Sequence, residues 1–211
     1  MVPVSFAPKF KSIERDNGVR AKTSLEKVRK LRPAFDKKFG TLTAANSSFL
    51  TDGAAASLLM SADKAAELGV PVKAEVVDFV FTGQDLDDEL LLGPAYAVSR
   101  LLDKVGMTLA DIDVFEFHEA FAGQILANLN ALASDEFAQK HLGRDKAVGQ
   151  VDMNKFNLWG GSLSIGHPFG ATGSRLLTTA ANRLHAENGT YAIIAACAAG
   201  AHGHAMLIKK A

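Results

Sequence analysis

Residues 160–173 read GGSLSIGHPFGATG and place one histidine, His167, among five glycines. Glycine lets the backbone approach another group closely, and Pro168 fixes the direction of the chain after the histidine. A helical pattern follows, over roughly residues 171–187. This layout predicts a site where an imidazole meets a substrate and bulky side chains are excluded.

Two other interpretations of this stretch stay open. Gly170 and Gly173 precede a helix and could cradle a phosphate, although the spacing matches neither a P-loop nor the dinucleotide-binding pattern. The stretch could also be a tight packing loop in which His167 is a structural residue.

Composition sets the class of protein. The chain has 211 residues, 48% of them hydrophobic and 22% charged, which is typical of a globular protein with a sizeable core. Lys+Arg and Asp+Glu both number 23, so the balanced charge gives no support to a nucleic-acid partner. No apolar run approaches the roughly 20 residues of a membrane span. Residues 1–24 lack the apolar core of a signal peptide. Their basic composition also fits a transit peptide, but we expect an arm or loop there.

Strands and helices alternate along the chain, which predicts a mixed α/β fold. Apolar runs and turn signals predict the following elements: short helices at 24–31 (capped by Ser24) and 61–69, a buried strand at 54–60, strands at 73–81 and 111–118, helices at 94–105 and 120–133, a loop at 141–159, and two final strands at 190–200 and 202–210. The segments richest in functional residue types, 46–53, 118–122, 160–173 and 197–204, all lie at or after strand ends, where sites of α/β sheets tend to form.

His118 and Glu119 follow a predicted strand in FHEAFAG. A zinc site of the H-E-x-x-H type needs a second histidine at position 122, which is alanine, so the pattern gives little support to a metal. The pair either caps the strand end, with Glu119 bound to backbone, or provides a second imidazole that holds a water molecule or a substrate oxygen.

Cys197, in AACAAGAHGHAM, is the only cysteine, so an intrachain disulfide is excluded. It is either a buried core thiol or a thiol near imidazoles that exchanges a proton. His202 and His204 would share one face of a strand, but no third metal ligand accompanies them.

Taken together and in order, NSS…TDGAA, HEAFAGQ, GGSLSIGHPFGATG and CAAGAHGHAM resemble the carboxyl-terminal half of the thiolase family, over nearly the whole chain. FEFHEAF and KFNLWGGSLSIGHPFGATG are most similar to the long-chain 3-ketoacyl-CoA thiolases of fatty-acid β-oxidation, among them the β subunit of the trifunctional complex and its bacterial counterparts. Most other thiolases have asparagine at the position of His118.

The resemblance implies a role for each motif residue. His167 would be the base that activates a nucleophilic cysteine, and Cys197 the acid and base for acetyl-CoA or the incoming thiol. His118 would order a water molecule in an oxyanion hole, with Glu119 beside it, and Ala199 would give a backbone N–H to the other oxyanion hole. Ser48 would touch the pantetheine arm of coenzyme A, and substrate would also contact Ala120 and Phe121.

The resemblance further implies a thiolase-like fold: a carboxyl-terminal half, with a mixed sheet between helix layers, plus remnants of a loop domain and of the amino-terminal half. We expect residues 1–45 to be the tail of the loop, or cofactor-binding, domain, 46–72 the end of the amino-terminal half, and 73–211 the carboxyl-terminal domain. In thiolases two similar halves pack into a five-layer α-β-α-β-α sandwich.

Two departures from the family pattern stand out. The family turn reads Cys-Ala-Gly-Gly-Gly or Cys-Ala-Ala-Gly-Gly, whereas positions 201 and 202 are alanine and histidine here; a positive φ at Ala201 would strain the turn. The family's acylated cysteine belongs to an amino-terminal motif, and the context of Cys197 matches the other catalytic cysteine.

The expected function is therefore thiolytic cleavage of 3-ketoacyl-CoA by coenzyme A, in concert with an amino-terminal half. The alternatives are a non-catalytic scaffold or acyl-CoA-binding subunit, a truncated gene product, and another enzyme of the thiolase superfamily. That other enzyme could be a ketoacyl synthase or a one-cysteine enzyme that uses Cys197 as nucleophile. Coenzyme A would be a substrate, with no permanently bound cofactor and no metal. Expected protein partners are a second copy, a complementary amino-terminal half and the β-oxidation α subunit, in the mitochondrial matrix or the bacterial cytoplasm.

A coenzyme A site also needs cations for its phosphates. The basic stretch KVRKLRPAFDKK, with Arg29, and Arg20 before it could supply them; a solvated helix face is the other interpretation.

Overall fold

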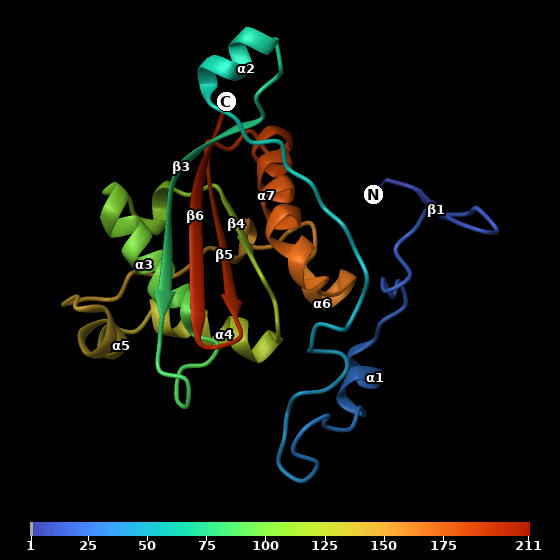
Figure 1. Ribbon diagram of the computed structural model, residues 1–211. Coiled ribbons are helices and arrows are strands. Elements are labelled where there is room, and N and C mark those ends of the chain that lie inside the picture. Colours follow the sequence, from blue (N-terminus) through green and yellow to red (C-terminus); the bar gives the residue numbers. More distant parts are fainter. Residues whose placement is uncertain (1) are drawn as a thin grey trace.

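The computed structural model describes residues 2–211, and its centre is a four-stranded sheet in the order β3-β6-β5-β4 (Figure 1). The strands are β3 (Ala74–Gly83), β4 (Val114–Phe117), β5 (Tyr191–Ala198) and β6 (His202–Lys210). β6 runs antiparallel to both neighbours, while β4 and β5 are parallel. A single bridge from Phe115 to Phe156 continues the sheet beyond β4.

Helices cover both faces of this sheet. Helices α3 (Gly93–Val105) and α4 (Ala122–Leu132) lie on one face, and α7 (Phe169–Ala186) lies on the other (Figure 1). The core is accordingly split in two. One cluster includes Phe115, Phe117, Ile193 and Leu207 with Leu101 of α3; the second includes Val114, Ile194 and Ile208 with Leu176 and Leu184 of α7. The predicted α/β class, with a mixed sheet between helix layers, is confirmed.

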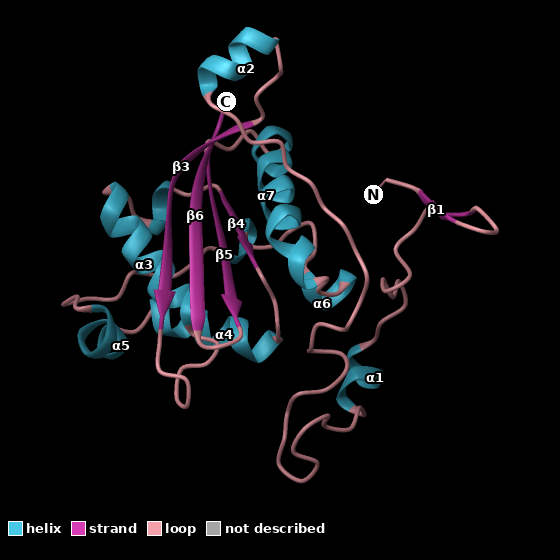
Figure 2. Cartoon of the chain, in the orientation of Figure 1, coloured by secondary structure: helices cyan, strands magenta, loops and turns pink. Residues whose placement is uncertain are grey.

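The remaining elements are short and lie mostly at the periphery (Figure 2). They are β1 (Val4–Phe6), β2 (Lys11–Ile13), α1 (Leu25–Arg29), α2 (Ala62–Leu68), η1 (Leu109–Asp111), α5 (Asp135–Phe137), η2 (Ala138–Leu142), η3 (Met153–Lys155) and α6 (Ser162–Ile165). No helix within residues 2–211 combines the length and apolar character that crossing a membrane requires.

Several observed helix ends agree with the predicted ones, because the predicted capping residues cap the helices in the structure. The Ser24 hydroxyl accepts a hydrogen bond from the backbone N–H of Lys27 at the start of α1. Gly69 and Gly106 end α2 and α3 in the left-handed conformation, with φ of 63° and 68°. Glycine adopts the left-handed conformation at little cost, so a glycine after a helical pattern is a local signal for the end of the helix.

The strand predicted at residues 54–60 is wrong. This segment has no regular structure, and Leu58 and Leu59 are 77% and 79% exposed. A strand needs a neighbour for its backbone N–H and C=O groups. Within residues 2–211 no strand lies beside this segment, so its apolar composition alone does not make it a strand.

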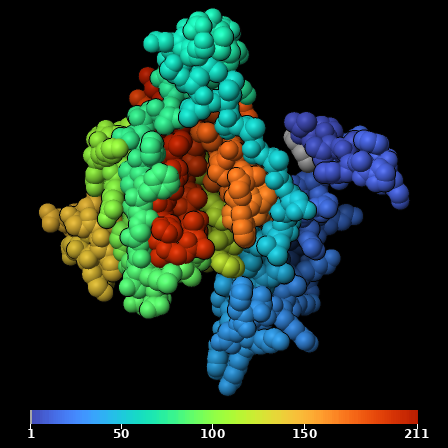
Figure 3. Space-filling view, viewed as in Figure 1, coloured from blue at the N-terminus to red at the C-terminus, as the bar shows by residue number. Residues whose placement is uncertain are grey.

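Smaller differences occur elsewhere. The expected amino-terminal arm contains the β1–β2 hairpin and projects from the body of the molecule (Figure 3). The predicted loop at 141–159 contains the end of η2 and all of η3, and the unpredicted α6 precedes α7. α7 begins at Phe169, two residues before the predicted start, and Pro168 is its N-cap residue.

Candidate active site

His118 stands at the carboxyl end of β4, one residue after the strand. Its backbone N–H donates to the carbonyl oxygen of Ala195 on β5, at 2.8 Å, so the sheet fixes its position. Its side chain is only 2% exposed, and Nδ1 lies 2.9 Å from Oγ of Ser162 on α6. The prediction that β4 ends at this histidine is close, since the strand itself ends at Phe117.

His167 lies in the turn between α6 and α7. Its backbone N–H donates to the carbonyl oxygen of Phe49, and Nδ1 lies 2.7 Å from Oγ1 of Thr172 in the first turns of α7. Gly166 makes this approach possible: its φ is 83°, and a Cβ there would lie 2.4 Å from Cγ2 of Thr51. The glycine before the histidine is therefore required by backbone conformation and by close contact.

The two imidazole rings lie against each other in a tilted arrangement, although they are 49 positions apart in sequence. Their ring centroids are 3.9 Å apart, with an interplanar angle of 35°. Burial, the charge of His167 and the charge of Arg175 lower the pKa of His118 to about 3. Burial and Arg175 also lower the pKa of His167. Near neutral pH both rings are therefore uncharged, which suits one as a base and the other as a neutral hydrogen-bond donor.

Glu119 holds the glycine-rich loop in place. Its Oε1 accepts from Nδ2 of Asn157 at 2.7 Å, and Oε2 accepts from the backbone N–H of Leu163 at 3.1 Å. A Cβ on Gly161 would lie only 2.4 Å from Oε2. The carboxylate therefore occupies the space that Gly161 leaves free.

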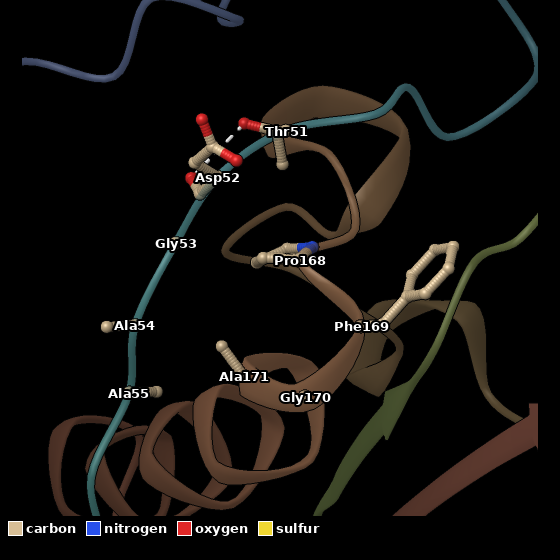
Figure 4. A pocket seen from close by; sticks show the side chains of 9 residues that line it. All are labelled: Thr51, Asp52, Gly53, Ala54, Ala55, Pro168, Phe169, Gly170 and Ala171. Atoms are coloured by element: carbon tan, nitrogen blue, oxygen red, sulfur yellow. Dashed lines mark hydrogen bonds between the residues drawn. The ribbon is translucent and has the colours of Figure 1, made fainter.

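Ser48, Ala120 and Phe121 lie close together. The N–H of Ser48 donates to the carbonyl oxygen of Ala120, and Ser47 forms an isolated antiparallel bridge with Phe121. The chain then runs past the start of α7, where Thr51–Ala55 and Pro168–Ala171 line an open cavity of about 420 Å³ (Figure 4). Two distant segments thus flank the His167 turn.

Cys197 is buried, 7% exposed, near the end of β5. Burial raises the pKa of its thiol to about 11, so the thiol is protonated at neutral pH. Within residues 2–211 no hydrogen bond joins Cys197 to either histidine of the pair. His118 and β5 are nevertheless linked two residues earlier, through Ala195.

The turn after Cys197 is strained as the sequence suggested. Ala199 is exposed in this turn, and Ala201 has a φ of 54° and is fully buried. An L-residue other than glycine loses roughly 1–2 kcal/mol in that conformation. His202 is exposed. His204 is half-buried and lies against Phe81 in a tilted arrangement, with ring centroids 4.6 Å apart, so neither histidine joins the His118–His167 pair.

Sequence reasoning missed four residues of the site: Ser162, Thr172, Arg175 and Asn157. Ser162 and Thr172 belong to the same glycine-rich motif as His167. Their role becomes visible only in the folded chain, where each hydroxyl contacts an imidazole. Asn157 donates from Nδ2 to the carbonyl oxygen of Phe117 and accepts from the N–H of the same residue, 40 positions away. No local signal indicates a pairing across that distance.

Comparison with known protein families gives two matches. A model of the thiolase carboxyl-terminal domain matches residues 70–210, and a model of the thiolase amino-terminal domain matches residues 1–63. Among curated relatives, the mitochondrial trifunctional enzyme subunit beta of Rattus norvegicus is 58% identical over 198 residues, or 94% of this chain and 42% of the relative. A 3-ketoacyl-CoA thiolase of Pseudoalteromonas translucida is 49% identical over 211 residues, or 100% of this chain and 48% of the relative. The chain thus spans about half the length of the curated relatives it matches.

Solved thiolase structures share the fold. Bacillus anthracis acetyl-CoA acetyltransferase superposes with a TM-score of 0.86 at 33% identity, covering 100% of this chain and 49% of that one. Human mitochondrial 3-ketoacyl-CoA thiolase in complex with CoA gives 0.78 at 32%, covering 95% and 46%. The dimeric peroxisomal thiolase of Saccharomyces cerevisiae gives 0.80 at 29%, covering 100% and 48%. The motifs, the sheet order, the paired histidines and these similarities agree, and the chain belongs to the thiolase family.

Proposed function

We propose that this chain carries the acid–base residues of a thiolase that cleaves 3-ketoacyl-CoA with coenzyme A, giving acetyl-CoA and a shortened acyl-CoA. The observation that carries the proposal is the contact between two neutral imidazoles, His118 and His167, at 3.9 Å. The similarity to 3-ketoacyl-CoA thiolases supports the choice of substrate class.

His167 serves as the base. The Thr172 hydroxyl can donate its proton to the carbonyl oxygen of Pro168, which lies 3.4 Å away, and Oγ1 then accepts from Nδ1–H of His167. This leaves Nε2 unprotonated and able to take the proton of a thiol. The thiol belongs to a cysteine outside these 211 residues, in a thiolase amino-terminal half.

Cys197 serves as the second acid and base. The activated thiolate attacks the 3-keto carbon, the C2–C3 bond breaks, and the acyl group stays on sulfur while the enolate of acetyl-CoA leaves. Cys197, protonated at neutral pH because its pKa is about 11, gives its proton to the enolate carbon. Its thiolate then takes the thiol proton of incoming coenzyme A, whose sulfur accepts the acyl group and releases the first cysteine.

The remaining site residues bind the oxygens and the coenzyme A arm. His118 orders a water molecule on the thioester oxygen, with Glu119 beside it, and the N–H groups of the turn at Ala199 form the second oxyanion hole. Each such donor contributes about 2–4 kcal/mol to the transition state. Ser48, Ala120 and Phe121, held together by backbone contacts, line the pantetheine path.

The wider assignments rest on the relatives. Coenzyme A acts as a substrate, and nothing in the proposed reaction needs a resident cofactor. We assign residues 1–45 to the loop domain, 46–72 to the end of the amino-terminal half and 73–211 to the carboxyl-terminal domain. A second copy, a complementary half and a β-oxidation α subunit are the proposed protein partners, in a mitochondrial matrix or bacterial cytoplasm.

The test is thiolysis of a long-chain 3-ketoacyl-CoA by coenzyme A. The chain is assayed alone and after mixing with the amino-terminal half of a related thiolase, and Cys197→Ala and His167→Ala variants are assayed beside it. We expect activity only in the mixture, and its loss in both variants. If the chain alone is active and Cys197→Ala abolishes that activity, Cys197 is instead the nucleophile. If no mixture is active, the non-catalytic scaffold is favoured over the proposed function.

A further inference from the structure

Ser162 and Arg175 lie directly behind His118. Oγ of Ser162 is 2.9 Å from Nδ1 of His118, and Nη2 of Arg175 donates to the same Oγ at 3.0 Å. Ser162 is fully buried, and Arg175 is half-buried with its pKa lowered by burial. The three side chains form a line from α7 through α6 to the end of β4.

Counting donors and acceptors decides where the hydroxyl proton goes. A guanidinium has five N–H donors and no acceptor, so Ser162 Oγ must accept from Arg175. The single Ser162 proton then needs an acceptor, and among residues 2–211 His118 Nδ1 is the only one within hydrogen-bond distance. The opposite arrangement would leave a buried hydroxyl proton without an acceptor, which is unfavourable.

We propose that Ser162, held by Arg175, is a positioning residue that keeps His118 in the Nε2–H form. The inference rests on the proposed function for its catalytic meaning, but the tautomer itself is a property of the chain. His118 then presents an N–H donor beside His167, whose own Nδ1 donates to Thr172 and whose Nε2 is free. The two adjacent rings therefore hold opposite tautomers, one a donor and the other a base.

This arrangement matters for an oxyanion. With the proton on Nδ1, the Nε2 lone pair of His118 would face the developing negative charge and repel it. With the proton on Nε2, the ring donates to that oxygen or to the water molecule that binds it. Arg175 adds a positive charge behind Ser162, which opposes protonation of either ring.

The direct test is ¹⁵N-histidine NMR of the full chain at neutral pH, with the His118 signals identified from a His118→Asn variant. We expect Nδ1 of His118 in the unprotonated range and Nε2 in the protonated range. Ser162→Ala should move both signals toward a mixture of tautomers, whereas Ser162→Thr should restore them. Ser164→Ala is the matched control, because Ser164 lies in the same helix and donates only to the carbonyl oxygen of Gly161. A protonated Nδ1 in the unsubstituted chain overturns the proposal, whatever the variants do.

A kinetic arm connects the tautomer with catalysis. In the thiolysis mixture, Ser162→Ala should lower kcat roughly 10- to 100-fold, somewhat less than loss of an oxyanion donor itself, and leave KM nearly unchanged. Ser162→Thr and Ser164→Ala should keep most of kcat. An unchanged kcat in Ser162→Ala, together with a shifted tautomer, would contradict the catalytic role. If the unsubstituted mixture is inactive, the proposed function fails, and the NMR result alone decides whether Ser162 sets the tautomer.

Discussion

Cys197 is a buried thiol with a raised pKa, and the burial causes the shift. It is 7% exposed, and its pKa rises from 9 to about 11 because burial disfavours the thiolate. Near neutral pH such a thiol is protonated, so it can donate a proton but is a poor nucleophile. That suits a group that protonates an enolate.

We therefore expect slow alkylation of Cys197. A two-unit rise in pKa lowers the thiolate fraction near neutral pH on the order of 100-fold, and burial slows access further. Because the chain has one cysteine, iodoacetamide uptake followed by mass spectrometry reports this residue alone. The control is the same chain unfolded in urea. A folded chain that reacts as fast as the unfolded one would contradict the raised pKa.

Gly161 has no Cβ, and this leaves room for the carboxylate of Glu119. We expect Gly161→Ala to lower the free energy of unfolding by about 1–3 kcal/mol, because its Cβ would displace a carboxylate that binds Asn157 and Leu163. Gly173 provides the comparison: it lies in α7, and a Cβ there meets no atom within 4 Å. Gly173→Ala should raise the free energy of unfolding by about 0.5–1 kcal/mol. Urea denaturation measures both, and equal effects would argue against a specific role for Gly161.

At the scale of elements, α7 is joined to β4 by a buried cation. Arg183 is fully buried and donates to Oε1 of Glu116 at 2.8 Å, to the carbonyl oxygens of Phe115 and Lys155, and to Glu187. Burial raises the pKa of Glu116 to about 6, while the hydrogen bond and charge of Arg183 oppose that shift. Removing only the cation would leave a buried carboxylate without its partner.

We expect Arg183→Met to destabilise the chain by about 3–5 kcal/mol. Adding Glu116→Gln should recover part of that loss, because the unpaired charge is then gone. Lys146→Ala breaks an exposed pair with Asp135 and should cost no more than about 1 kcal/mol. Thermal unfolding of the four proteins gives the comparison. Equal losses from Arg183→Met and Lys146→Ala would show that the α7–β4 pair adds little.

At the scale of the whole molecule, the neutral histidine pair makes stability depend on pH. An ordinary histidine has a pKa of 6.5, whereas His118 in the folded chain has a pKa of about 3. Between these values the unfolded chain takes up a proton that the folded chain does not. The contribution of His118 is therefore fully present above pH 6.5 and is lost as the pH falls toward 3.

The expected loss at pH 5.5 relative to pH 7.5 is about 1.4 kcal/mol from His118 alone. Since other groups also titrate in this range, the informative quantity is the difference between the unsubstituted chain and His118→Asn. Urea midpoints at the two pH values provide it, and the asparagine variant should show the smaller pH effect. Identical effects in the two proteins would contradict a neutral, buried His118.

The irregular segment 54–60 places apolar side chains on the surface of the molecule. Leu58 and Leu59 are among its most exposed apolar side chains, and contiguous apolar surface promotes association. We expect the chain to self-associate, and Leu58→Lys with Leu59→Lys to shift it toward monomer in analytical ultracentrifugation without lowering its thermal stability. Leu86→Lys, at a leucine that is 57% exposed in another loop, should leave association unchanged. Equal effects would place the contact elsewhere.

Local signals in the amino-acid sequence were enough to predict the α/β class, most boundaries of the larger helices and strands, and the motifs that identify the family. These depend on local signals: apolar periodicity for α3 and β6, capping by Ser24 and Gly106, and the glycines around His167. Three features depend on the folded chain: residues 54–60 form no strand, Glu116 is buried against Arg183, and Ser162 contacts His118 across 44 positions. Periodicity and capping act over a few residues. Strand pairing and hydrogen bonds between distant side chains depend on which surfaces the fold brings together.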